Sequence, residues 1–150
     1  MSGFSGELPS TIGALRHLNS LQISGLEVVE SFPKWITNLT SLEVLEFSNC
    51  GLHGTIPSFI ADLKKLTKLA LYACNLFGEI PRHIFNLTQL DTIFLHSNSF
   101  TGTVELASFL TLPNLFDLSL SHNKLTVING KKQFFIQILP QHRVLGFVIL

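Results

Sequence analysis

Charged residues are scarce in this sequence of 150 residues, and neither sign of charge is in excess. Only 13% of the residues are charged, and ten basic side chains balance ten acidic ones. The chain therefore lacks the basic footprint that nucleic acids and anionic membranes attract. Disorder is excluded as well, because the hydrophobic share of 46% is too high for a chain that stays unfolded. We expect a single folded domain that has no nucleic-acid partner.

Long apolar runs are also missing. The longest candidate for a membrane span, residues 134–150, is interrupted by a proline and three polar residues at 140–143. It is shorter than the ~20 residues that a spanning helix needs. Residues 1–7 have neither the basic n-region nor the apolar h-region of a signal peptide. As written, the sequence predicts neither a transmembrane segment nor a signal peptide.

Cysteines and catalytic motifs are sparse too. The two cysteines, Cys50 and Cys74, are too few for a disulfide framework and have no zinc-ligand neighbours at a useful spacing. The six histidines do not cluster, and Asp62, Asp91 and Asp117 are too widely spaced to form paired carboxylates for acid–base work. Metalloprotease, nucleophile-elbow, phosphate-loop, dinucleotide and kinase signatures are missing. We predict that the chain is not an enzyme and needs no metal or other cofactor.

What the sequence has in abundance is an internal repeat with a period of 24 residues and one step of 25. The template L-x-x-L-x-x-L-x-L-x-x-N-x-L-x-G-x-I-P matches the chain in successive registers. Its G-x-I/L-P turn occurs at residues 6–9, 54–57 and 78–81. The paired L-x-L slots fall at Leu21/Ile23, Leu45/Phe47, Leu69/Leu71, Ile93/Leu95 and Leu118/Leu120. Several slots agree in every register, which excludes chance as the cause.

The spacing within each repeat predicts its structure. In the short strand x-L-x-L-x, alternation turns the leucines inward and the residues between them outward. One repeat cannot bury its own apolar side chains, so the repeats stack as coils and their strands form a parallel sheet. Apolar residues spaced by three and four at 58–63 and 82–87 predict short 3₁₀ or helical turns on the convex side. We therefore predict an α/β solenoid with a concave parallel β-sheet.

The repeats also set the predicted domain boundaries. About five of them make up a solenoid over residues 1–128, and the register breaks after Ile128. Residues 129–150 form either one degenerate terminal strand or an irregular C-terminal tail. The chain opens inside a repeat, and solenoid ends expose their core unless a cap covers them. An opening inside a repeat and a loss of register near the C-terminus are both expected of a truncated product.

A slot for asparagine follows each strand of the template. Asn98 and Asn123 fill it, and a buried amide there has enough donors and acceptors to satisfy backbone groups in the bend between coils. Cys50 and Cys74 occupy the same slot with a smaller thiol that forms weaker hydrogen bonds. Because they lie one repeat apart, the two cysteines either form a disulfide or remain buried thiols that stand in for asparagine.

Two phrases of the sequence carry a family resemblance. Residues 75–88, NLFGEIPRHIFNLT, resemble the plant-specific class of leucine-rich repeat, and residues 119–125, SLSHNKL, match its recurring L-x-L-S-x-N-x-L phrase. That class builds the ectodomains of plant receptor-like proteins and receptor-like kinases, and the resemblance covers roughly Phe4 to Ile128. It implies a leucine-rich-repeat solenoid at the cell surface, on the extracellular side of the plasma membrane. It also implies a concave face that binds a protein, peptide or glycan ligand, together with a co-receptor.

Candidate ligand-binding residues lie at the outward positions of the predicted strands. Tyr72, Phe94 and His96 stand out there, because aromatic groups on a solvated sheet face cost solubility unless something covers them. Glu46 and Lys68 would add polar contacts from strands ~4.8 Å apart. The alternatives are cross-strand packing without a partner for the aromatic residues and plain solvation for the charged ones.

Two N-glycosylation sequons occupy the same slot of two repeats, with Asn38 and Asn86 as the acceptors. The slot lies on the predicted convex side, where a glycan would leave the sheet free. Glycosylation at either residue requires entry into the secretory route.

The function that these features favour is ligand binding by the concave face of a truncated plant receptor ectodomain, in defence or developmental signalling. A first alternative is a protein inhibitor of secreted cell-wall hydrolases, which resembles the same repeat class. A second is the extracellular part of a receptor kinase, whose kinase would lie outside this chain. A third is a truncated product without function.

Overall fold

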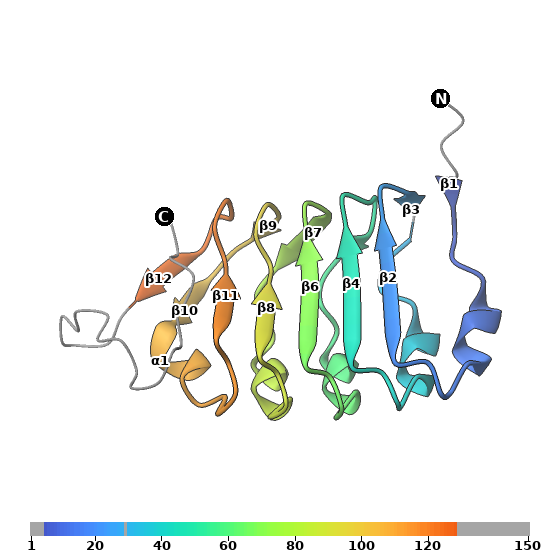
Figure 1. Ribbon diagram of the computed structural model, residues 1–150. Helices are drawn as coiled ribbons and strands as arrows, with labels where there is room; N and C mark the ends of the chain where they lie inside the picture. The colour runs from blue at the N-terminus through green and yellow to red at the C-terminus, as the bar shows by residue number, and fades with distance from the viewer. Residues whose placement is uncertain (1–4, 29, 129–150) are drawn as a thin grey trace.

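The computed structural model describes residues 5–28 and 30–128, so the predicted tail or terminal strand at 129–150 lies outside the described residues. Five parallel strands lie side by side in one sheet, in the order β11-β8-β6-β4-β2 (Figure 1). They are β2 (Ser20–Ser24), β4 (Val44–Ser48), β6 (Lys68–Tyr72), β8 (Thr92–Phe94) and β11 (Asp117–Ser119). Each repeat of the sequence therefore forms one coil of a solenoid, and we name a coil by its strand in this sheet.

The leucine slots of the repeat are in register across the sheet. Leu45 pairs with Leu69, and Leu69 pairs with Ile93. All three side chains are 0% exposed and belong to one apolar core. Strand alternation explains this arrangement, because every second residue of each strand faces the interior. The predicted α/β solenoid with a parallel sheet is confirmed.

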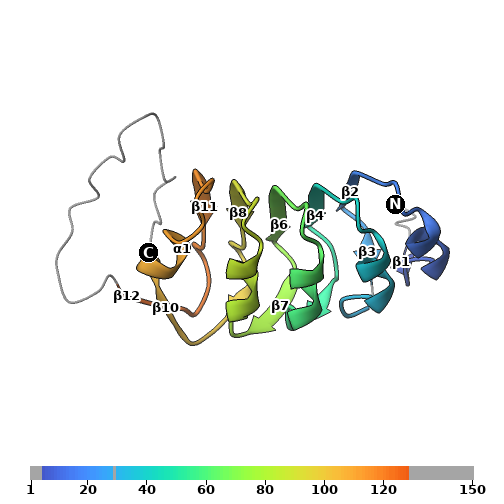
Figure 2. The same cartoon turned by 90° about the horizontal axis from the view of Figure 1, so that it is seen from below.

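Short 3₁₀ helices follow the proline of the repeat. They are η1 (Ser10–Ala14), η2 (Lys34–Asn38), η3 (Ser58–Asp62) and η4 (Arg82–Asn86). The preceding prolines have φ between −76° and −59°, the range that the proline ring imposes. Between β8 and β11, Glu105 stands in the proline slot and a short α-helix follows, α1 (Leu106–Phe109). Figure 2 shows these helices on the side of the solenoid away from the five-stranded sheet, as predicted.

Shorter parallel ladders join the coils away from the main sheet. Their strands are β1 (Ser5–Gly6), β3 (Glu27–Val28), β5 (His53–Gly54), β7 (Asn75–Gly78), β9 (Ser99–Phe100), β10 (Thr103–Glu105) and β12 (Thr126–Ile128). β1 pairs with β3, β7 pairs with both β5 and β9, and β10 pairs with β12. In the described part of the chain, no helix has the length and hydropathy needed to cross a membrane.

A residue just beyond each sheet strand has a left-handed backbone. Gly25, Asn49, Ala73, Ser97 and His122 have φ between 48° and 70°. Each of these residues lies past the end of its strand, where the chain leaves the sheet for the bend. A Cβ at such a φ costs free energy, so only glycine adopts it without strain.

Candidate functional site

A carboxylate on β4 is the polar centre of the concave face, by which we mean the outward face of the five-stranded sheet. Lys68 Nζ donates to Glu46 Oε2 at 2.8 Å, and the Tyr72 hydroxyl donates to Glu46 Oε1 at 3.2 Å. The Ser48 hydroxyl adds a third, longer bond to Oε1 at 3.4 Å. Register explains the contacts: Glu46 pairs with Ala70, so Lys68 and Tyr72 are its diagonal neighbours on β6.

The surroundings of Glu46 favour its charged form. The hydrogen bond from Lys68 has the largest effect on the pKa of Glu46 and lowers it below its usual value of 4.5. Burial has the next largest effect and raises this pKa. The positive charge of Lys68 and the hydrogen bonds from Tyr72 and Ser48 lower the pKa further. The Glu46 side chain is mostly buried, whereas a third of the Lys68 side chain stays exposed. The ion pair therefore presents its cationic partner to solvent.

Three aromatic rings pack beside this ion pair. The Tyr72 and His96 rings are stacked, with centroids 4.6 Å apart and an interplanar angle of 17°. The Phe94 ring meets both edge-on, at centroid distances of 6.4 Å from Tyr72 and 6.0 Å from His96. Lys68 Nζ lies 5.9 Å from the centroid of the Phe94 ring, within reach of a cation–π contact.

We call Glu46, Lys68, Tyr72, Phe94 and His96 the concave cluster. Ala70 shows how tightly it packs: this residue faces outward, in register with Glu46 and Phe94, yet is 0% exposed. Only neighbouring side chains on the same face can cover it. The sequence singled out these five residues separately. The structure brings them together on β4, β6 and β8, with His96 two residues past the end of β8.

His96 contributes a polar atom that the fold leaves unsatisfied. Its Nδ1 is buried and has no hydrogen-bond partner among the described residues. Burial, and to a lesser extent the charge of His122, lowers the pKa of His96 below the ordinary 6.5. The ring is therefore neutral at pH 7, and such an imidazole can donate or accept one further hydrogen bond.

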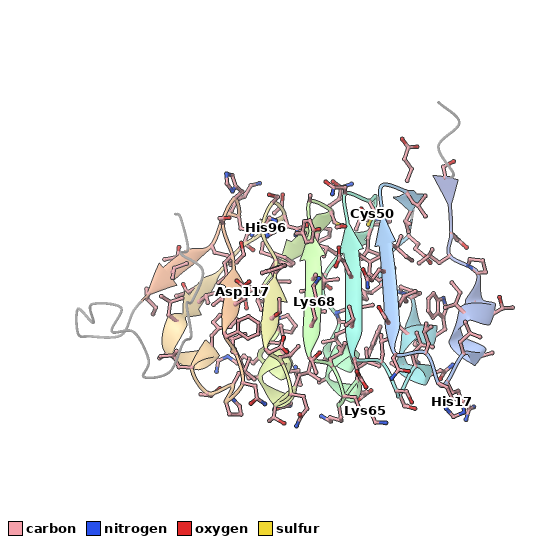
Figure 3. All side chains as sticks on the ribbon, viewed as in Figure 1. His17, Cys50, Lys65, Lys68, His96 and Asp117 are labelled. Atoms are coloured by element: carbon pink, nitrogen blue, oxygen red, sulfur yellow. The ribbon has the colours of Figure 1, made fainter. Side chains whose placement is uncertain are left out.

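Figure 3 shows Lys68, His96 and Asp117 on the same face of the sheet, with Asp117 on β11 beyond the cluster. Sequence reasoning had passed over Ser48 as a site residue, although its hydroxyl contacts Glu46. A small polar residue at an outward strand position carries no signal by itself. Only its spacing of two from Glu46 could have drawn attention to it.

The side chains in the asparagine slot, just past the C-terminal end of each sheet strand, form a ladder of hydrogen bonds between coils. Asn98 Nδ2 donates to the carbonyls of Leu71, Leu95 and His96 at 2.7, 3.1 and 3.2 Å. Its Oδ1 accepts from the Leu76 N–H at 3.2 Å. Asn123 repeats the pattern one coil later, with Oδ1 accepting from the Phe100 N–H at 3.0 Å. Each amide thus connects its own coil to the preceding one.

Thiols occupy the same slot in the two preceding coils. Cys50 and Cys74 are buried and free, and their Sγ atoms are 3.3 Å apart. Cys74 Sγ also lies 3.5 Å from the Phe47 carbonyl oxygen and 3.4 Å from the Tyr72 carbonyl oxygen, and its single S–H can donate to either. These acceptors are the counterparts of the Leu71 and His96 carbonyls that Asn98 contacts.

The sequon asparagines lie away from the cluster. Asn38 and Asn86 are both exposed, and each is the last residue of a 3₁₀ helix, η2 or η4. Their side chains are on the side of the solenoid that the helices cover, so a glycan on either would not block the sheet.

A hollow of about 470 Å³ lies between η4 and α1, also away from the cluster. Glu79, Arg82, Phe85, Glu105 and Phe109 are among the residues that line it. The hollow is partly open to solvent, and none of the candidate ligand-binding residues lines it. Across residues 5–28 and 30–128, no group of three or more His, Cys, Asp or Glu side chains could hold a metal ion.

Comparison with known proteins identifies the repeat. The family model "Leucine Rich Repeat" matches residues 41–63. Comparison with curated protein sequences finds no match. Solved structures do match over most of the chain.

One is a plant ice-binding protein, with 33% sequence identity and a TM-score of 0.76 over 81% of this chain and 39% of its own. Others are ectodomains of Arabidopsis thaliana receptor kinases. GASSHO1/SCHENGEN3, solved in complex with CASPARIAN STRIP INTEGRITY FACTOR 2, is 34% identical with a TM-score of 0.73, over 82% of this chain and 15% of its own. HAESA, solved in complex with an N-terminally extended IDA peptide hormone, is 29% identical with a TM-score of 0.71. The match covers 82% of this chain and 24% of the HAESA chain.

The chain thus spans less than half the length of each of these structures. The matches nevertheless cover 81% or 82% of this chain. The chain belongs to the leucine-rich-repeat family, in the class of repeat from which plant receptor-kinase ectodomains are built.

Proposed function

We propose that the chain is the ligand-binding part of a plant cell-surface receptor, and that its concave face binds a peptide or protein without catalysing a reaction. The observation that supports this proposal is the concave cluster. Its three aromatic rings lie on the outward face of the sheet, where they add nothing to the buried core of leucines. Aromatic side chains supply much of the binding energy of protein interfaces.

The cluster is also organised in advance of binding. The Tyr72 hydroxyl is bonded to Glu46, its ring is stacked on His96, and Lys68 is held by the same carboxylate. Side chains that are already fixed lose little rotamer entropy when a ligand arrives. A peptide lying across β4, β6 and β8 would meet an apolar surface of rings, with the partly exposed Lys68 ammonium available for polar contacts.

Likeness to the receptor ectodomains favours a peptide among the candidate ligands. The HAESA structure contains a peptide hormone, and the GASSHO1/SCHENGEN3 structure contains CASPARIAN STRIP INTEGRITY FACTOR 2. An extracellular location, glycans on Asn38 and Asn86 and a co-receptor belong to the same proposal. So does a role in defence or developmental signalling.

The ice-binding relative suggests another ligand, which the concave face does not favour. A crystal lattice is periodic, so a surface that matches it needs the same residue type in successive coils. The outward residues at the start of the five sheet strands are all different, namely Ser20, Val44, Lys68, Thr92 and Asp117.

The test compares peptide binding by the wild-type chain and by the double variant Tyr72→Ala/Phe94→Ala. A panel of synthetic plant peptide hormones is screened by thermal shift, and the Kd of each hit is measured by calorimetry. We expect the double variant to raise Kd about tenfold or more, because truncating an anchor in an interface costs about 2 kcal/mol. An unchanged Kd would show that the ligand binds elsewhere.

Phe77→Ala serves as the matched control. Phe77 is a half-exposed aromatic residue on β7, outside the five-stranded sheet. Its loss removes a similar apolar area from the surface, so it should leave Kd at the wild-type value. Circular dichroism of each variant checks that the fold is intact.

A further inference from the structure

Two cysteine side chains meet between the coils of β4 and β6. The Sγ atoms of Cys50 and Cys74 are 3.3 Å apart, and each residue is 8% exposed. Both thiols are free, and they are the two cysteines of the whole sequence. Neither belongs to the concave cluster, and the proposed ligand binding makes no use of them.

The backbone holds the two thiols at a separation that a disulfide can span. β4 and β6 are paired in register up to Ser48 and Tyr72, and a cysteine follows two residues after each. The Asn49 N–H donates to the Tyr72 carbonyl at 3.2 Å, so the two segments stay side by side beyond the strands. Neighbouring parallel strands lie ~4.8 Å apart, within the range of about 4.4–6.8 Å between the Cα atoms of a disulfide.

A thiol satisfies this slot less well than an amide does. Cys74 reaches the carbonyls of Phe47 and Tyr72 at 3.5 and 3.4 Å, through a weak S–H donor. One coil later, Asn98 makes the equivalent contacts at 2.7 and 3.2 Å. Hydrogen bonding in the slot therefore connects β4 to β6 more weakly than β6 to β8. A covalent link between the cysteines would reinforce this junction.

We propose that Cys50 and Cys74 are an oxidation site for hydroperoxides, at which hydrogen peroxide joins two adjacent coils by a disulfide. The Cys50 thiolate attacks one peroxide oxygen, the O–O bond breaks, and the departing hydroxide takes up a proton to become water. The Cys74 sulfur then displaces hydroxide from the Cys50 sulfenic acid, and the Cys74 proton leaves with it as a second water. Two thiols lose two electrons, and one peroxide is reduced to two waters.

The contact between the thiols gives each a separate role. The hydrogen bond from Cys74 is the largest cause that lowers the pKa of Cys50, which favours the thiolate form of this side chain. The same contact, followed by burial, raises the pKa of Cys74, which keeps its proton until the second step. Cys50 is the attacking sulfur and Cys74 the resolving one. A small, neutral peroxide can reach both through the narrow exposed area.

The test is peroxide treatment of the reduced, folded chain, followed by alkylation and mass spectrometry. We expect both thiols to stop reacting with the alkylating reagent at the same time, while the protein stays monomeric. Dithiothreitol should restore the reactivity of both. Trypsin should release residues 35–64 and 69–82 as one linked species, because these peptides carry Cys50 and Cys74. Two thiols that still react after peroxide treatment, or peptides that remain separate, would overturn the proposal.

Single variants test the two roles. Cys74→Asn introduces the residue that Asn98 supplies in the same slot, so this variant should fold. Without its resolving thiol, peroxide should leave a sulfenic acid at Cys50 that a dimedone probe traps, whereas the wild type should trap little. The matched variant Cys50→Asn should react with peroxide about tenfold more slowly or worse, because burial still raises the pKa of its remaining thiol, Cys74. Equal rates for the two variants would refute the assignment of Cys50 as the attacking sulfur.

Discussion

The slot after each sheet strand shows how one side chain connects two coils. Asn98 makes four hydrogen bonds there, three donated to carbonyls and one accepted from the Leu76 N–H. Among these acceptors, the Leu71 carbonyl belongs to the preceding coil, so the amide joins coils as well as closing its own bend. No apolar side chain can replace these bonds.

Asn98→Ala should therefore destabilise the fold by about 1–3 kcal/mol, because it leaves buried backbone groups without partners. Chemical denaturation of the wild type and the variant measures the difference as a shift of the unfolding midpoint. The same midpoint in both proteins would contradict the role of the ladder.

The pH dependence of stability tests the surroundings of His96. Burial lowers the pKa of His96 below 6.5 in the folded chain, so the unfolded chain binds a proton at a pH where the folded chain does not. The stability that this residue contributes is thus fully present above pH 6.5 and decreases as the pH falls through the folded-state pKa.

His96→Phe keeps a ring against Tyr72 but cannot titrate. Unfolding followed from pH 7.5 to 5 should show a smaller loss of stability in this variant than in the wild type. If the two proteins lose stability in parallel over that range, His96 is not protected from protonation.

At the scale of elements, the ladders bring neighbouring coils into close backbone contact. Gly51 lies in the bend between β4 and β5, and a Cβ built on it would overlap the Val28 carbonyl oxygen of β3. Because the obstacle is backbone rather than a flexible side chain, it cannot move aside without disturbing β3. Gly25, in the bend after β2, has open space around its Cβ position, although its φ is +70°.

Gly51→Ala should cost about 1–3 kcal/mol of stability, as overpacking in a tight contact does. Gly25→Ala is the control and should cost about 1–2 kcal/mol or less, because only the left-handed backbone opposes it. Thermal unfolding of both variants gives the comparison. A Gly51 variant that is no less stable than the Gly25 variant would show that the coils are more loosely packed than described.

Much of this architecture could be predicted from the sequence, because period and strand alternation fix which residues share a face. Leu45, Leu69 and Ile93 were identifiable as interior positions for that reason, and they are in register in the core. The outward positions of Tyr72 and Phe94 followed from the same period and strand alternation. These features depend only on spacing.

Features that depend on side-chain rotamers or local backbone could not be predicted. Register makes Glu46 a neighbour of Lys68 and Tyr72, but it does not determine that both side chains turn toward the carboxylate and cover Ala70. The left-handed backbone at Ala73 could not be predicted either, because an alanine, unlike a glycine, gives no sequence signal for it.

At the scale of the whole molecule, stacking of coils creates both the core and the candidate site. Leu15 is 52% exposed, whereas Leu39 and Leu63, in the same slot of later coils, are at most 1% exposed. A coil buries its leucines only where another coil covers them, as expected of a solenoid. The concave cluster has the same dependence, since β4, β6 and β8 each supply part of it (Figure 1).

The stacking of coils, and the site that it assembles, are tested most directly by a double-mutant cycle between Tyr72 and His96. Their rings come from adjacent coils and lie 4.6 Å apart. The free energy of unfolding is measured for the wild type, Tyr72→Ala, His96→Ala and the double variant. We predict a favourable coupling energy of about 0.5–1.5 kcal/mol. Strictly additive effects, with no coupling, would mean that the two rings do not meet and that the coils are not stacked in this register.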